Sequence, residues 1–574
     1  MNKTAKDVQV LPIAQNTRVL RSRTWTRLKF EIEYGLQRGT TANSYLIEGD
    51  RTVLLDPPGE SFGDIFLKNL QQRIDLKTID YLILGHVNAN RGYTLKALLA
   101  LAPQITCVCT NPAAIVLGEI FNENLPNLKI IKAEETLDIG QGHQLELIPI
   151  PLPRWPDALA TYDPQTQILY TDKLFGAHVC GDQVFDEGWR VYEQDRRYYF
   201  DCLMAPCAKQ VSTAINKLGG KNPRIYATGH GPLVRYGLQE LTQSYQQWLQ
   251  QEKTQELSVA LIYASAYGNT ATLAQAIARG ISKAGVRVES INAEIADGET
   301  IKTAVVAADG FIFGSPTLGG HAPTQIQTAL GITLANADSK KLAGVFGSYG
   351  WSGEAIDFLE GKLRDGGYSF GFEPIRVKFT PTEVVLKTCE EAGTDFAQAV
   401  KKAKKAQTPR PSVLSATSNY TDQALGRIVG SLCIVTTQQG ELKSAMLASW
   451  VSQATFTPPG ITVAVAKERA IESLLYQDSK FVLNILAEGK HLKLMKHFLK
   501  PFAPGEDRFQ GVETTTANNG CPILSDALAY LECRVVNRME CGDHWLIYAI
   551  AEVGELLQST GITAVHHRKS GNHY

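Results

Sequence analysis

A regular alternation of apolar strands and amphipathic helices between residues 257 and 405 constrains the fold most strongly. Leu257–Ala264 reads as a buried strand, and Thr270–Ala284 reads as a helix because Leu273, Ile277 and Ile281 recur on one face. Four further strands are predicted at Val286–Ile291, Gly310–Gly314, Leu342–Phe346 and Ile375–Phe379. Five strands that alternate with helices predict a doubly wound parallel sheet.

Polar loops follow three of these strands. Hydroxyls and backbone N–H groups at a helix N-terminus suit a phosphate, although the first loop taken alone could be no more than a helix cap. No G-x-x-x-x-G-K-[ST] motif is present, which argues against a nucleoside triphosphate. The loop residues are Ser265, Tyr267, Gly268, Asn269 and Thr270, then Ser315, Pro316 and Thr317, then Ser348, Tyr349, Gly350 and Trp351.

The three loops in this order resemble those of flavodoxin, which binds FMN at the carboxyl end of its sheet. The resemblance spans about residues 257–405. It implies that the first loop holds the FMN phosphate and that the other two surround the isoalloxazine ring.

Strand-rich regions lie on both sides of this segment. Because 574 residues correspond to three or four domains at ~150 residues each, we predict domains at 1–256, 257–406 and 419–574, joined by a linker at 407–418. The linker carries Pro409 and Pro411 and follows a helix predicted at Thr394–Ala406. Predicted elements outside the middle region are a helix at Thr94–Leu101 and strands at Ser44–Ile47, Thr52–Leu55, Tyr81–Leu84, Leu145–Ile150, Ile168–Thr171, Arg224–Ala227, Val435–Thr437, Ile461–Val465, Phe481–Leu486 and Trp545–Val553.

Charge and cysteine content exclude several classes of protein. The formal net charge is −1, from 57 basic and 58 acidic residues, which argues against a nucleic-acid binder. No apolar run approaches the ~20 residues of a membrane span, and Met1–Val10 is too polar for a signal peptide. The ten cysteines form no C-x-x-C pair and are expected to be reduced. We therefore expect a soluble, cytoplasmic protein.

The N-terminal region, placed before a flavodoxin-like segment, is similar to that of the flavodiiron proteins. This resemblance implies a metallo-β-lactamase-like αββα sandwich whose diiron site has an H-x-E-x-D-H segment, a histidine, a bridging aspartate and a last histidine. Only the first and last of the matching positions keep the residue of a ligand. The seven positions are His86, Asn88, Asn90, Arg91, Arg154, Lys173 and His230.

Three cations therefore stand where the family has iron ligands. Arginine is not a metal ligand, and iron requires anionic oxygen ligands, so we predict no diiron centre. We expect the cations to fill the metal volume and to pair with Asp157, Asp172 or Asp182, or to hold an anion such as chloride or sulfate. Two alternatives are a single metal on the two histidines with asparagine oxygens, and a Lys173 whose pKa is lowered by like charges and which has its own chemistry.

The C-terminal region resembles the flavin reductase-like split β-barrels. The resemblance implies a second flavin, FMN or FAD, bound near His544, with NAD(P)H as the electron donor. His544 follows Gly542 and Asp543, and this short motif also fits an ordinary loop histidine. The residues expected to contact the flavin are Ser449, Trp450, Val451 and Ser452.

The three modules in this order resemble the cyanobacterial type of flavodiiron protein, which reduces O₂ to water. With its substituted site, this chain would be an electron-input subunit that feeds a paralogue with an intact diiron site in a head-to-tail homo- or heterodimer. Ferredoxin is an alternative donor. Two other readings are a stand-alone NAD(P)H–flavin reductase, or diaphorase, and a regulatory partner of an active paralogue.

Overall fold

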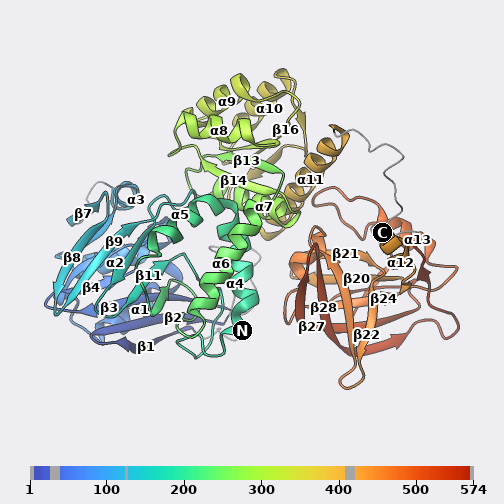
Figure 1. Cartoon of the computed structure of the whole chain (residues 1–574), viewed down its shortest axis with the longest axis horizontal. Coiled ribbons are helices and arrows are strands. Elements are labelled where there is room, and N and C mark those ends of the chain that lie inside the picture. Colours follow the sequence, from blue (N-terminus) through green and yellow to red (C-terminus); the bar gives the residue numbers. More distant parts are fainter. Residues whose placement is uncertain (1–5, 26–38, 123–126, 408–419, 569–574) are drawn as a thin grey trace. The chain divides into compact units, whose positions relative to one another are not determined.

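The computed structural model describes residues 6–25, 39–122, 127–407 and 420–568 (Figure 1). These residues group into two units, residues 1–256 with 287–304 and residues 257–286 with 305–574. The segment Met1–Ala5 and nearly all of the predicted linker, residues 408–418, lie outside the described residues.

Two β-sheets form the framework of the first unit. The first sheet has seven strands in chain order: β1 (Lys6–Ala14), β2 (Thr17–Thr24), β3 (Thr40–Glu48), β4 (Thr52–Leu55), β5 (Ile79–Ile83), β6 (Thr106–Thr110) and β7 (Asn127–Ile131). The second sheet has the order β12-β11-β10-β9-β8, with β8 (Glu135–Gly140), β9 (His143–Pro149), β10 (Leu159–Asp163), β11 (Ile168–Asp172) and β12 (Ile225–Thr228). Its helices are α1 (Gly63–Gln71), α2 (Ala89–Leu101), α3 (Asn111–Phe121), α4 (Glu193–Tyr199), α5 (Ala208–Leu218) and α6 (Leu238–Lys253).

The period of two along each strand divides the core of this unit into two layers. Leu46 and Leu82 point to one face of the first sheet, where they pack with Phe66 of α1 and Leu98 of α2. Tyr45 and other side chains of the opposite face pack with residues of the second sheet. Helices on one side and a second sheet on the other give the expected lactamase-like sandwich.

The parallel sheet predicted for the middle of the chain is present. The strand order is β14-β13-β15-β16-β17, and β18 also pairs with β16. β13 is parallel to β15, and β15 is parallel to β16, so their carboxyl ends lie at one edge. The strands are β13 (Ser258–Tyr263), β14 (Arg287–Asn292), β15 (Gly310–Pro316), β16 (Leu342–Tyr349), β17 (Ser369–Phe370) and β18 (Ile375–Lys378), and the helices are α7 (Asn269–Lys283), α8 (Gly298–Ala307), α9 (Thr324–Asn336), α10 (Glu354–Asp365) and α11 (Glu383–Gln407).

The helix α11 is longer than the sequence predicts, because it begins at Glu383 and not at Thr394. Gly393, inside it, approaches α7 so closely that a Cβ atom there would lie 2.1 Å from the Ile277 carbonyl oxygen. Gly280 on α7 faces α11 in the same way, 1.9 Å from the Glu390 carbonyl oxygen. The glycine that discourages a helix prediction therefore serves close helix packing.

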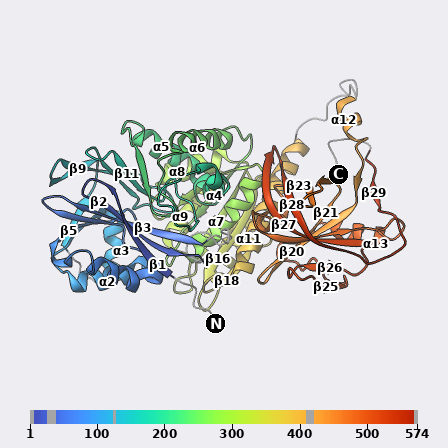
Figure 2. The same ribbon diagram turned by 90° about the horizontal axis from the view of Figure 1, so that it is seen from below.

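A curled antiparallel sheet forms the rest of the second unit (Figure 2). Its order is β21-β20-β24-β27-β28-β23-β22. Val435 of β20, Val463 of β23 and Trp545 of β28 share one buried cluster, as expected for a barrel interior. The C-terminal elements are α12 (Tyr420–Leu425), β19 (Gly430–Ser431), β20 (Cys433–Gln439), β21 (Leu442–Ala448), β22 (Val451–Thr455), β23 (Gly460–Ala466), η7 (Ala470–Leu474), β24 (Lys480–Ile485), α13 (Leu492–Leu499), β25 (Thr514–Thr516), β26 (Pro522–Leu524), β27 (Ala529–Cys541), β28 (His544–Leu556) and β29 (Val565–His566).

The predicted strands all lie within or overlap observed strands, and α7 begins one residue before its predicted start, whereas two helices begin five or more residues earlier than predicted. Besides α11, α2 begins at Ala89 and not at Thr94. Among the described residues, no helix combines the length and apolar character needed to cross a bilayer.

Candidate functional site

The three loops of the parallel sheet meet at its carboxyl edge. Thr270, in the first turn of α7, shares a 2.9 Å hydrogen bond between hydroxyls with Ser348 at the end of β16. The Thr317 backbone N–H donates to the Ser348 carbonyl oxygen over 2.9 Å, which joins the second loop to the third. The Ser265 hydroxyl accepts from the Ala271 N–H at 3.0 Å. The structure thus brings together the loops that the sequence predicts as one site.

Two large aromatic side chains of these loops have little protein cover. Tyr267 is 87% exposed and Trp351 is 90% exposed. Trp351 has one ring neighbour in an edge contact, Phe379, at 6.5 Å between ring centroids. Exposed rings beside a cluster of hydroxyls fit a flat, phosphate-bearing cofactor.

Backbone geometry at the carboxyl edge of the parallel sheet also fits a flat, phosphate-bearing cofactor. Gly268 has a φ of 81° directly before α7, which a side chain would strain. A Cβ atom at Gly347 would lie 2.2 Å from the Ser315 carbonyl oxygen, so β15 and β16 approach closely there. Within the described residues, the buried Thr317 hydroxyl has no hydrogen-bond partner, which leaves a polar group for a ligand. The remaining predicted residues, Pro316, Tyr349, Gly350 and Asn269, lie on the same strand ends and helix start.

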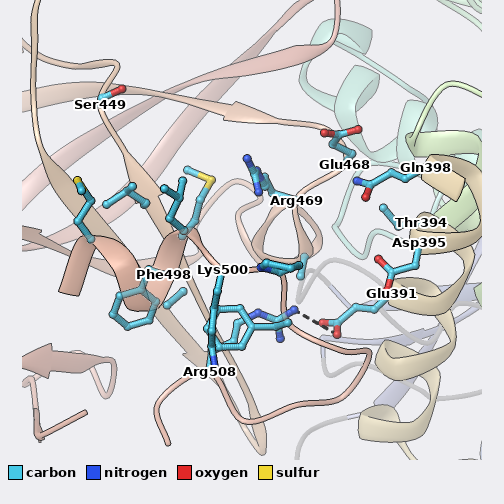
Figure 3. A pocket seen from close by; sticks show the side chains of 18 of the residues that line it. Glu391, Thr394, Asp395, Gln398, Ser449, Glu468, Arg469, Phe498, Lys500 and Arg508 are labelled. Atoms are coloured by element: carbon cyan, nitrogen blue, oxygen red, sulfur yellow. Dashed lines mark ion pairs between the residues drawn. The ribbon is translucent and has the colours of Figure 1, made fainter. Parts of the chain in front are cut away.

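A second candidate site is a cavity of about 260 Å³ beside the C-terminal barrel (Figure 3). Phe498 of α13 and apolar residues of β21 line one side of it, and Ser449 contributes a hydroxyl. Residues of α11 line the opposite side, as Figure 3 shows for Glu391 and Asp395. Of the four residues predicted to contact the second flavin, only Ser449 lines this cavity.

Charged side chains surround the apolar part of the cavity. Arg469, Lys500 and Arg508 supply positive charge, and Arg508 forms a 3.2 Å ion pair with Glu391. Burial and the nearby charge of Glu391 raise the pKa of Asp395 to about 6, although Arg508 opposes the shift. An apolar wall with several cations suits a flat ring that carries a phosphate.

The other predicted residues of this module do not line that cavity. Trp450 and His544 form a separate cluster. The rings of Trp450 and His544 are 5.0 Å apart, with an angle of 35° between their planes. His544 Nδ1 lies 2.8 Å from Asp543 Oδ1, and this hydrogen bond lowers the pKa of Asp543. Val451 is half-buried, and the exposed Ser452 donates its hydroxyl to the Gln453 carbonyl oxygen.

The third site is the set of substituted positions in the first unit, and its centre is Arg91. The Arg91 guanidinium donates to Asp56 Oδ1 at 3.0 Å, to Asp172 Oδ1 at 2.8 Å and to the His86 carbonyl oxygen at 2.7 Å. Asn88 caps α2 by accepting from the Arg91 backbone N–H at 2.9 Å. One buried cation is therefore held between two buried carboxylates.

The pKa values of two buried carboxylates of this site, Asp56 and Asp157, shift in opposite directions. Burial and the neighbouring Asp172 raise the pKa of Asp56 to about 7, although Arg91 opposes the shift. Asp157 also lies in the interior, and its burial favours a higher pKa. The charge of His86 and hydrogen bonds from His86 and Val87 N–H outweigh burial and lower the pKa of Asp157.

The expectation that the cations pair with Asp157, Asp172 or Asp182 is confirmed for Asp172, which binds Arg91. Besides Arg91, Lys173 places its Nζ 3.9 Å from Asp172 Oδ2. Asp157 instead binds His86, and Asp182 binds Arg23 at 2.9 Å.

The remaining substituted positions surround a small cavity or an aromatic ring. Lys173 and Arg154 both lie against the Trp155 ring, at 5.8 and 5.6 Å from its centroid. His230 contacts the Thr41 carbonyl oxygen through Nδ1 at 2.7 Å, and its ring lies 4.6 Å from that of His178. The cavity is about 20 Å³, which is near the space of one or two waters, and its lining includes Asn88, Asn90, Arg91 and His230.

The donor set at these positions does not fit two irons. In the part of the chain that the structure describes, no group of three or more His, Cys, Asp or Glu side chains is arranged to hold a metal ion. Asp56 and Asp172 have the unusual backbone φ values of 51° and 43°, which shows that the backbone is strained where these carboxylates meet Arg91.

Sequence reasoning missed two residues of this site. Asp56 follows the buried strand β4 directly, in Asp56-Pro57-Pro58-Gly59, and a polar residue at a strand end is a signal that could have been used. His178 contacts both His230 and the Thr40 hydroxyl, the latter at 2.6 Å. No sequence pattern marks His178.

Comparisons with known proteins find three domain families along the chain. Family models match residues 40–231 (ODP family beta lactamase), 261–393 (Flavodoxin) and 425–570 (Flavin reductase like domain). "Putative diflavin flavoprotein A 3" of Synechocystis is 68% identical over 572 residues, which cover 99% of this chain and 96% of that protein. "Putative diflavin flavoprotein A 6" of Nostoc is 66% identical over 570 residues, or 99% of each chain.

A solved structure supports the same relationship. The "Metal soaked Flv1 flavodiiron core" of Synechocystis is 67% identical and has a TM-score of 0.68. It covers 70% of this chain and all of that chain. With its lactamase-like, flavodoxin-like and flavin reductase-like domains, the chain belongs to the three-domain flavodiiron proteins, whose close relatives are named diflavin flavoprotein A.

Proposed function

We propose that this chain is the NAD(P)H-dependent electron-input subunit of a flavodiiron hetero-oligomer that reduces O₂ to water. Electrons would pass from the C-terminal flavin to FMN and then to the diiron site of a paralogous subunit. Each hydride carries two electrons, so reduction of one O₂ to two waters consumes two NAD(P)H and two further protons. The reaction would take place in the cytoplasm.

The observation that carries this proposal is the position of Arg91. Its guanidinium bridges Asp56 and Asp172 at a position where the flavodiiron resemblance expects an iron ligand. Arginine does not lose its proton in proteins, so it does not coordinate iron. The oxygen-reducing centre must then be supplied by another subunit, while this chain keeps its flavin modules.

In the flavodoxin module, the chain's own residues would bind and orient FMN. Ser265, Thr270 and the N–H groups of the first turn of α7 would hold the phosphate, where the helix dipole favours negative charge. The exposed side chains of Tyr267 and Trp351 would cover the two faces of the isoalloxazine ring. A bound flavin accepts hydride or single electrons, which is the chemistry that this transfer requires.

In the reductase module, the cavity beside Ser449 would hold the second flavin, FMN or FAD. Arg469, Lys500 and Arg508 would attract its phosphate, and Phe498 would contact the ring system. The adjacent, tilted rings of Trp450 and His544 would guide the nicotinamide. These assignments extend the sequence predictions with three cations that sequence reasoning missed.

The partner would be a paralogue with His, Glu and Asp at all seven ligand positions, in a head-to-tail dimer. A homodimer of this chain is the alternative assembly, and ferredoxin is the alternative donor. Electron transfer between subunits requires that the FMN of one lie close to the iron of the other, which a head-to-tail arrangement provides.

The deciding experiment combines metal analysis with oxygen uptake. The purified chain should contain no stoichiometric iron and should consume O₂ slowly with NADPH or NADH. Addition of the iron-bearing paralogue should raise uptake well above the sum of the separate rates. Two irons per chain, together with fast four-electron reduction of O₂ by this chain alone, would overturn the proposal.

A stand-alone NAD(P)H–flavin reductase, or diaphorase, is the second candidate. It is favoured by the second unit, whose candidate flavin sites are lined entirely by residues of that unit. It predicts turnover with artificial acceptors and no stimulation by the paralogue. A regulatory partner, in contrast, would leave the complex working after both flavin sites of this chain are disabled.

A further inference from the structure

The helix α11 closes the second flavin cavity, although it belongs to the flavodoxin module. Lys387, Glu391 and Asp395 are spaced four residues apart and therefore lie on one face of the helix. Thr394, Asp395 and Gln398 line the cavity directly (Figure 3). The helix α11 also packs closely on α7, through Gly393 and Gly280.

Lys387 holds one wall of the cavity. Its buried ammonium group donates to the Ala470 carbonyl oxygen and to the Ser473 hydroxyl. Ala470 and its neighbour Arg469 line the cavity. From α7, Arg279 reinforces the same segment, because its Nη2 donates to Glu472 Oε2 at 3.3 Å.

Glu391, one turn further along α11, holds a second segment of the wall, residues 505–508. Its Oε2 accepts from the Gly505 backbone N–H at 3.0 Å and lies 3.2 Å from Arg508 Nη2, the ion pair drawn in Figure 3. This pair is buried, with side-chain exposures of 8% for Glu391 and 11% for Arg508. Arg508 is also one of the cations that face the cavity.

The geometry points to Lys387 and Glu391 as positioning residues for the second flavin. They fix two segments of the cavity wall, 469–473 and 505–508. The second flavin site is then a composite, and its affinity depends on a helix of the FMN module. This inference deepens the proposed function and rests on its assignment of the second flavin to this cavity.

The test is a titration of the full-length apoprotein with FMN. The background carries Tyr267→Ala and Trp351→Ala, two exposed positions, so that the flavodoxin site is weakened and the second site is resolved. Glu391→Gln retains an acceptor for Gly505 but loses the charge that orients Arg508, and it should weaken the second site about tenfold to a hundredfold. Lys387→Met should act in the same direction.

The matched control is Lys402→Met, the same substitution at an exposed position of the same helix. It should leave FMN affinity at the second site unchanged. Each variant's melting temperature and, in chains with Tyr267 and Trp351 intact, its FMN affinity at the flavodoxin site show whether the effect is local.

The outcomes separate this inference from the proposed function. The parent chain is the one with Tyr267 and Trp351 intact and no other substitution. If it binds a single flavin in total, the second flavin site itself is refuted. A parent that binds two flavins, with unchanged second-site affinity in both Glu391→Gln and Lys387→Met, would refute the positioning role alone. Selective loss at the second site, with the melting temperature and the first site preserved, supports it.

Discussion

The guanidinium of Arg91 lies 2.8 Å from the carboxylate of Asp172, 81 residues away in the sequence, and both side chains are buried. Asp56 binds the same guanidinium at 3.0 Å. The Arg91 side chain thus supplies the positive charge that faces the carboxylates of Asp56 and Asp172. These two carboxylates, which the sequence pattern does not mark as ligands, compensate Arg91, and one of them, Asp172, also lies 3.9 Å from Lys173 Nζ.

This relationship predicts a large stability effect for Arg91→Ala. The variant leaves Asp56 and Asp172 buried without their cation, which should cost about 3–5 kcal/mol in free energy of unfolding. The measurement is chemical denaturation of the first unit's transition in the full chain. Combining Arg91→Met with Asp56→Asn and Asp172→Asn should be milder than Arg91→Ala alone, and equal losses would contradict the ion-pair explanation.

The raised pKa of Asp56 predicts a pH dependence of stability. Its value of about 7 in the folded state lies above the ordinary 3.8, so the folded state binds a proton that the unfolded state releases. The resulting stabilisation is present below pH ~4 and is lost as pH rises toward 7, with a slope of at most about 1.4 kcal/mol per pH unit. Asp56→Asn should lack this component, so wild type should lose stability relative to the variant across that range. A constant difference between the two would contradict the assignment.

Much of the fold could be predicted from the sequence, because strand and helix periods are local properties. The predicted starts of two helices are wrong, because tertiary contacts and not local periodicity decide where these helices begin. The start of α11 was predicted too late because Gly393 breaks the helical pattern, and its reason, close approach to α7, involves a distant segment. The start of α2 at Ala89 depends on Asn88 as a cap, and Asn88 lies in a segment that the family resemblance marks only as former ligand positions.

The candidate sites divide in the same way. Loops that follow parallel strands are brought together by topology, so strand order predicts that the three loops meet, whereas the particular hydrogen bond between Thr270 and Ser348 is seen only in the structure. The sequence does not predict that Lys500 and Arg508 line the second cavity, because they come from a segment without a motif. Asp56 was missed because its role depends on pairing with Arg91, which spacing does not reveal.

The exposed rings predict a specific loss of FMN affinity. Tyr267→Ala and Trp351→Ala should each weaken FMN binding at the flavodoxin site by about 1 kcal/mol or more, near tenfold, because ring stacking is lost. Since both side chains are largely exposed, the melting temperature of the apoprotein should not change. Phe456→Ala is the control, since Phe456 is 86% exposed on the barrel. Equal losses in all three variants would show that the effect is not one of flavin stacking.

The adjacent rings of Trp450 and His544 in the reductase module predict a defect in hydride transfer when His544 is removed. His544→Ala should slow flavin reduction by NAD(P)H about tenfold, measured by stopped-flow absorbance, while flavin content stays the same. The exposed His567, also in the C-terminal module, provides the control variant His567→Ala. An unchanged reduction rate in His544→Ala would identify His544 as an ordinary loop residue.

Restoring the ligand set should restore iron. The substitutions Asn88→Glu, Asn90→Asp, Arg91→His, Arg154→His and Lys173→Asp recreate the family pattern around His86 and His230. The expected result is iron bound at close to two per chain, because anionic oxygens and imidazoles replace three fixed cations. A set that keeps Arg91 but changes the other four positions should bind far less, since the guanidinium would still bridge Asp56 and Asp172. Metal analysis after reconstitution with ferrous iron compares the two sets with the unaltered chain. If the four-position set binds as much iron as the five-position set, Arg91 is not the group that keeps metal out.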